Sequence, residues 1–132
     1  AEDGEAGLKA AEKAVEEIER FVRGVVLPFP GGICRSGSKV GSMKYKLPAS
    51  TNHPFCPTLR GKVPDSKVPE GVTCVYEIVI NGLTKEDVLK AMGVGIRAAI
   101  TVKGVKKITA VNFGGRLGPY HLYIREALEV AK

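Results

Sequence analysis

The sequence has no apolar run close to the roughly 20 residues that a membrane span requires, and no signal peptide opens it. It has only three cysteines, an odd number that makes no disulfide framework and suits a reducing cytoplasm. It has only four Tyr and four Phe, and no strand candidate carries the aromatic residues of an RNA-binding sheet. We therefore expect a cytoplasmic protein that binds neither a membrane nor nucleic acid.

The 132 residues are the size of one domain, and 44% of them are hydrophobic. The net charge of +6 is unevenly placed, because residues 28–70 hold seven basic and two acidic residues, a net +5, together with seven of the eight prolines. Such a segment attracts anions, unless it is simply a solvated surface loop. A connection this long is often functional, so we treat 28–70 as a long basic insertion.

Hydrophobic periodicity predicts two helices and several strands. The first helix has apolar residues on one face, and the second opens with Thr84 as an N-terminal cap. Two glycines inside the second helix, Gly93 and Gly95, indicate that another part of the protein packs very close to it, for example another backbone. The helices are expected at 5–23 and 84–102, and the strands at 25–27, 72–80, 106–113 and 120–125.

This order of elements predicts an α+β fold. A ferredoxin-like antiparallel α/β sandwich runs strand, helix, strand, strand, helix, strand. The chain lacks the first of these strands and has an extra one at its end, so we expect a permuted or truncated sandwich. We also expect Gly93, Gly95 and the apolar flank of 72–80 to form a bare surface through which the chain self-associates.

Glu77 is the most informative single residue. Alternation along the strand puts it on the face of Val75 and Val79, and the opposite face carries Cys74, Tyr76 and Ile78. Both faces are apolar, which predicts a central strand. Burial there disfavours the charged form of a carboxylate, which suits a proton-transfer group. The alternative is a structural Glu paired with Lys or Arg.

Several other motifs have weaker chemical meaning. The loop 36–41 (SGSKVG) lacks the spacing of a Walker loop, but its amides and Lys39 could hold a carboxylate or phosphate, or it is a flexible turn. The glycines of 114–118 precede a strand candidate and not a helix, which favours a hairpin loop over a dinucleotide site. His53, Cys34 and Cys56 lack zinc spacing, so we expect no metal site.

Together, these motifs resemble formylmethanofuran:tetrahydromethanopterin formyltransferase, over nearly the whole chain and in order. The resemblance is to the C-terminal lobe of that family. The matching runs are PFPGGI (28–33), SGSKVG (36–41) with Lys44-Tyr45, ASTN (49–52), VPEGV (68–72), VYEIVINGL (75–83) and NFGGRLG (112–118).

The resemblance implies both an assembly and an activity. Enzymes of this family have two related ferredoxin-like lobes, form dimers and tetramers, and use no metal or prosthetic group for the chemistry. They move a formyl group from the amine of methanofuran to N5 of tetrahydromethanopterin, in the C1 metabolism of methanogenic and sulfate-reducing archaea. The chain begins with Ala1, and we expect it to be processed or to be a single distal lobe, 1–132, of a longer enzyme.

The resemblance also identifies Glu77 as the catalytic carboxylate, because it is the Glu of the family's YEIVING motif. The substrates are anionic coenzymes, so we look for their binding residues in the basic segment. The predicted substrate-binding residues are Phe29, Gly31, Gly32, Arg35, Ser36, Gly37, Ser38, Lys39, Lys44 and Tyr45. The alternative is a non-catalytic basic module of the same fold that binds nucleic acid or a partner chain. Either another copy of the chain or an N-terminal lobe is the expected protein partner.

Overall fold

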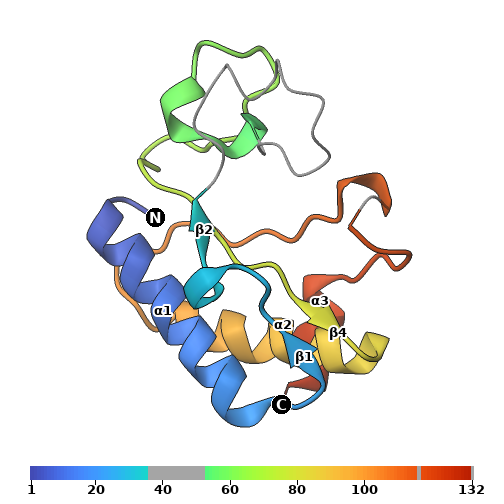
Figure 1. The fold of residues 1–132 in the computed structure, drawn as a ribbon. Coiled ribbons are helices and arrows are strands. Elements are labelled where there is room, and N and C mark those ends of the chain that lie inside the picture. The colour runs from blue at the N-terminus through green and yellow to red at the C-terminus, as the bar shows by residue number, and fades with distance from the viewer. Residues whose placement is uncertain (36–52, 116, 132) are drawn as a thin grey trace.

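The computed structural model describes residues 1–35, 53–115 and 117–131, and these residues form an α+β lobe (Figure 1). Its elements in this part of the chain are three α-helices and four short strands, joined by long irregular segments. The helices are α1 (Gly4–Phe21), α2 (Lys85–Ala99) and α3 (Ile124–Val130), and the strands are β1 (Val25–Val26), β2 (Cys34–Arg35), β3 (Tyr76–Glu77) and β4 (Asn81–Gly82).

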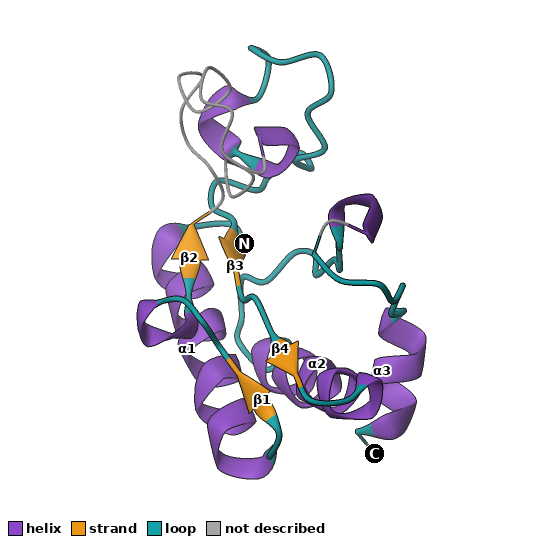
Figure 2. Cartoon of the chain, turned by 45° about the vertical axis from the view of Figure 1, so that its right-hand side comes forward, coloured by secondary structure: helices purple, strands orange, loops and turns teal. Residues whose placement is uncertain are grey.

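Helices α1 and α2 confirm the two predicted from periodicity. Asp3 caps α1 by accepting a hydrogen bond from the Ala6 amide at 2.7 Å, and Thr84 caps α2 by accepting one from the Asp87 amide at 3.1 Å. The two helices cross each other (Figure 2). Ile18 of α1 and Ala91 of α2 meet in the core between them, where both side chains are almost fully buried.

The glycines of α2 lie at close contacts, as their sequence positions predicted. A Cβ at Gly93 would collide with the backbone carbonyl oxygen of Ala127 in α3, and a Cβ at Gly95 would lie 2.9 Å from Ile18 Cδ1. Both positions are buried. The expectation that these glycines belong to a bare surface is therefore wrong, because α3 and α1 cover them.

The strands are shorter than predicted and form two antiparallel pairs, β1 with β4 and β2 with β3. The prediction of one continuous strand over 72–80 is wrong. Within this range, only Tyr76–Glu77 is paired with another described segment. The β-branched residues of 72–80 favour extended backbone, but a strand also needs a neighbour, and among the described residues β3 pairs only with β2. The central position expected for this strand is not observed.

Two further strand predictions are wrong. Residues 106–112 carry no strand, and 120–125 runs into α3 instead. The sequence of α3 has apolar residues at helical spacing, Ile124, Ala127 and Leu128, and its packing on Gly93 stabilises a helix of only seven residues. The glycines of 114–118 lie between the two predicted strands and belong to a turn. Asn112 holds this turn, because its side-chain amide donates to the Tyr120 carbonyl at 2.8 Å. This turn is a loop but not a hairpin.

Residues 53–72 stand away from the helices, beyond the ends of β2 and β3 (Figures 1 and 2). Arg60 holds this segment together, because its guanidinium donates to the carbonyls of both Pro69 and Val72. Arg60 was one of the basic residues expected to attract anions. In the structure it has a role within the fold.

Replacing Arg60 by Met leaves two carbonyl groups without this donor, so we expect the free energy of unfolding to fall by about 1–3 kcal/mol. Lys62→Met, at an exposed position in the same turn, is the matched control and should change stability by less than about 0.5 kcal/mol. Urea unfolding measures both variants. Equal stability of the two variants would contradict the structural role of Arg60.

Candidate active site

The site is built on the β2–β3 pair, which places Cys34 opposite Glu77 and Arg35 opposite Tyr76. The side chains of Cys74 and Tyr76 lie against Gly7 of α1, where a Cβ would come within 2.5 Å of Cys74 Sγ and 2.9 Å of the Tyr76 ring. Because alternate residues of an extended segment face opposite sides, Glu77 points away from α1. The structure therefore confirms that Cys74 and Tyr76 lie on one face of this segment, as predicted from the sequence.

Glu77 is half-buried and contacts the thiol of Cys34. Cys34 Sγ lies 3.6 Å from the Glu77 backbone oxygen and 3.9 Å from its carboxylate Oε2, and donates to both. Burial, the negative charge of Glu77 and this hydrogen bond together raise the pKa of Cys34 from 9.0 to about 11. The thiol therefore stays protonated at neutral pH and acts as a hydrogen-bond donor.

Cys34 was missed as a partner of Glu77 by sequence reasoning, which considered it only as a metal ligand. The two residues are 43 positions apart, so only the strand register brings them together. In the described part of the chain there is no group of three or more His, Cys, Asp or Glu side chains placed to hold a metal ion. His53 contacts Asp65 at 2.8 Å, and Cys56 contacts Thr58 at 3.1 Å.

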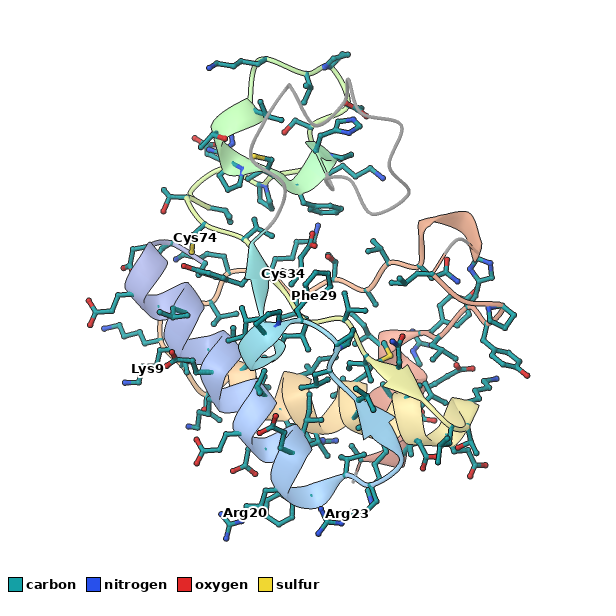
Figure 3. The ribbon with its side chains drawn as sticks, in the orientation of Figure 1. Lys9, Arg20, Arg23, Phe29, Cys34 and Cys74 are labelled. Carbon is teal, nitrogen blue, oxygen red and sulfur yellow. The ribbon has the colours of Figure 1, made fainter. Side chains whose placement is uncertain are left out.

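The turn before β2 contains three of the predicted substrate-binding residues. Phe29, labelled with Cys34 in Figure 3, is 40% exposed and leaves a ring accessible at the turn. Gly31 has φ +69°, and no described atom lies within 4 Å of the position of a Cβ, so the turn is open there. Gly32 differs, because it is buried against Val15 and its amide donates to the Phe29 carbonyl at 2.7 Å. The Gly32 amide is therefore committed to the turn.

Arg35 lies in β2, directly opposite Tyr76, so the chain that leads into the SGSKVG loop starts beside Glu77. The remaining predicted binding residues, and the expectation that this loop lies near Glu77, fall outside the described residues. They are Ser36, Gly37, Ser38, Lys39, Lys44 and Tyr45.

The raised pKa of Cys34 predicts how stability depends on pH. The fold favours the protonated thiol, so this contribution is complete below pH 9.0 and is lost as the pH rises toward about 11. We expect the free energy of unfolding to fall more steeply over this range in the wild type than in Cys34→Ala. Urea unfolding at several pH values measures the difference. Parallel curves would contradict the raised pKa of Cys34.

In the described residues no helix is long and apolar enough to cross a membrane. Comparison with known proteins finds a match to the family model "FTR, proximal lobe" over residues 1–127. The sequence resemblance led us to expect the distal lobe, and the matching description corrects this to the proximal one.

The chain is 55% identical over 132 residues to the formylmethanofuran–tetrahydromethanopterin formyltransferase of Methanocaldococcus jannaschii, covering 98% of this chain and 44% of that protein. It is 57% identical over 127 residues to the same enzyme of Methanopyrus kandleri, covering 96% of this chain and 41% of that protein. The chain thus spans about two fifths of the length of these relatives.

Two solved structures have the same fold. The formyltransferase of Methanosarcina barkeri has a TM-score of 0.82 at 49% identity, covering 96% of this chain and 42% of that one. A chain of the formyltransferase/hydrolase complex of Methylorubrum extorquens, solved with methylofuran, has a TM-score of 0.79 at 42% identity, covering 96% of this chain and 41% of that one. The family model matches residues 1–127, a range that includes both β2 and Glu77. The chain therefore belongs to the formylmethanofuran:tetrahydromethanopterin formyltransferase family and corresponds to its proximal lobe.

Proposed function

We propose that the chain is the proximal lobe of an enzyme that transfers a formyl group from formylmethanofuran to N5 of tetrahydromethanopterin. The observation that carries the proposal is the 55% identity with the Methanocaldococcus jannaschii formyltransferase, which extends over 98% of this chain. The reaction belongs to archaeal-type C1 metabolism. Free thiols at Cys34, Cys56 and Cys74 support a reducing cytoplasm as its location.

The lobe is proposed to be a permuted or truncated ferredoxin-like unit. Antiparallel pairing of its strands and the packing of α1 and α2 beside them support this assignment. Its protein partner is proposed to be another copy of the chain or the remaining part of the enzyme, because the chain covers only 44% of its relative. Val26 of β1 is 64% exposed and Leu83, which follows β4, is 87% exposed, and together they provide an apolar contact for such a partner.

The reaction poses three chemical demands. The donor is an amide, whose carbonyl carbon is a poor electrophile. The acceptor amine attacks that carbon unprotonated, and the donor amine leaves with a proton when its C–N bond breaks. Between these steps a tetrahedral oxyanion forms, so the site needs a proton-transfer group and hydrogen-bond donors for the oxyanion.

Glu77 is proposed to carry the proton transfers. Its half-buried carboxylate lies on the face of β3 that is turned away from α1, beside the strand that leads into the basic loop. A carboxyl group takes the proton of the attacking amine and returns one to the leaving amine, which needs neither a metal nor a prosthetic group.

The remaining binding roles are proposed for the turn and the loop that flank β2. Gly31 and Gly37 offer backbone amides for the oxyanion, whereas the amide of Gly32 is committed to the Phe29 carbonyl. Phe29 and Tyr45 offer rings to the coenzymes, Ser36 and Ser38 offer hydroxyl groups, and the cations of Arg35, Lys39 and Lys44 suit anionic coenzyme groups.

The proposal is tested by incubating the full-length protein with formylmethanofuran and tetrahydromethanopterin and following the formylated pterin. We expect turnover that depends on both coenzymes. The alternative of a non-catalytic nucleic-acid module predicts salt-dependent RNA binding instead, with no transfer. RNA binding without any transfer would reject the proposed function.

A further inference from the structure

The Cys34 thiol is a neighbour of Glu77 that the sequence analysis did not identify. We propose that Cys34 is a positioning residue, whose thiol donates to Glu77 Oε2 and holds the carboxyl group in its orientation for proton transfer. This inference rests on the proposed function, because it assigns Cys34 a role in that reaction.

The geometry supports a positioning role. Residues directly opposite each other in an antiparallel pair have side chains on the same face of the pair, and Cys34 is directly opposite Glu77. One sulfur atom lies 3.6 Å from the backbone oxygen and 3.9 Å from the carboxylate of the same residue. The thiol therefore links the Glu77 side chain to its own backbone, which limits the rotation of the carboxyl group.

The protonation state excludes the most obvious alternative, in which Cys34 is a nucleophile that carries the formyl group as a thioester. A thiolate is the nucleophilic form, and with a pKa of about 11 this form is scarce at neutral pH. A thiolate would also lie beside the negative carboxylate of Glu77. A protonated thiol, in contrast, is the form that donates.

The other two cysteines do not share this arrangement. Cys74 is buried and donates to the Asp3 carbonyl at 2.8 Å, and Cys56 is buried against Thr58. Cys74 serves as a matched control, because it is also a hydrogen-bonding thiol, close to β3, but on the opposite face from Glu77.

The first experiment tests the contact and does not depend on activity. Alkylation of Cys34 by iodoacetamide is measured by mass spectrometry at pH 8–9.5 in the wild type and in Glu77→Gln. Glu77→Gln removes the negative charge of Glu77, which is one of the causes that raise the pKa of Cys34, so Cys34 in the variant should react at least about threefold faster. An equal rate in the two proteins would overturn the contact.

The second experiment tests the role in the full-length protein. We expect Cys34→Ala to lower kcat by about 5–30-fold while KM stays within about twofold, because the loss is in orientation and not in coenzyme binding. Cys34→Ser keeps a hydrogen-bond donor, but its hydroxyl oxygen lies further from the Glu77 carboxylate because the Cβ–Oγ bond is shorter than the Cβ–Sγ bond. This variant should recover part of kcat. Cys74→Ala should keep kcat within about twofold, whatever its effect on stability.

The outcomes separate this inference from the proposed function. If the wild type transfers the formyl group and Cys34→Ala has an unchanged kcat, the positioning role is overturned but the proposed function stands. An equal loss of kcat in Cys34→Ser and Cys74→Ala indicates a packing defect and also overturns it. Absence of transfer in the wild type overturns both the function and the role, whereas the alkylation result still decides whether the contact exists.

Discussion

Replacing Glu77 by Gln should lower single-turnover formyl transfer by about 10²–10⁴-fold while both coenzymes still bind. Gln keeps the size and shape of the side chain and can still accept the hydrogen bond from Cys34, but it cannot take and return a proton. The measurement is a single-turnover assay with the full-length protein, together with binding of each coenzyme. Glu70→Gln, at an exposed position, is the control and should transfer at the wild-type rate.

Stability separates this role from the alternative left open by the sequence. If Glu77 transfers protons, Glu77→Gln should change the free energy of unfolding by less than about 1 kcal/mol, because the half-buried side chain keeps its packing. If Glu77 is instead a structural partner in a buried ion pair, the same change costs about 3–5 kcal/mol and spares the chemistry. A well-folded Glu77→Gln protein with unchanged transfer would end the catalytic assignment.

Replacing Gly93 by Ala should destabilise the lobe by about 1–3 kcal/mol, the usual cost of forcing an extra carbon into a packed site. The new Cβ would meet the backbone of Ala127, which cannot rotate away as a side chain can. This cost acts against the roughly 1 kcal/mol that Ala normally contributes over Gly inside a helix. Thermal and urea unfolding measure the effect.

The control is Gly4→Ala in α1, where no described atom lies within 4 Å of the new Cβ. Here only helix propensity acts, so stability should stay equal or rise by up to about 1 kcal/mol. If Gly93→Ala were as stable as Gly4→Ala, α3 would not pack on α2 as described.

Helices α1 and α2 could be predicted from the sequence because their signals are local. The apolar spacing and the capping residues Asp3 and Thr84 lie within the helices or next to them. Even the close contact at Gly93 was indicated, since glycine inside a helix is costly without a packing reason. The identity of the neighbour, the backbone of α3, was not indicated, because 120–125 was interpreted as a strand.

Strands could not be predicted as well, because a strand exists only where a second segment pairs with it. The β-branched run over 72–80 says nothing about its neighbours, and only Tyr76–Glu77 is paired there in the described chain. The same limit applies to the site. Glu77 was found from its motif, but Cys34 depends on the register between two segments 43 residues apart.

The most direct test of the proposed transfer uses formylmethanofuran labelled with ¹³C in the formyl carbon. The full-length protein is mixed with this donor and tetrahydromethanopterin, and the label is followed by carbon NMR. We predict that the label moves from the amide of methanofuran to N5 of the pterin, with no free formate on the way. Label that appears as formate, or that stays on methanofuran, would contradict the account.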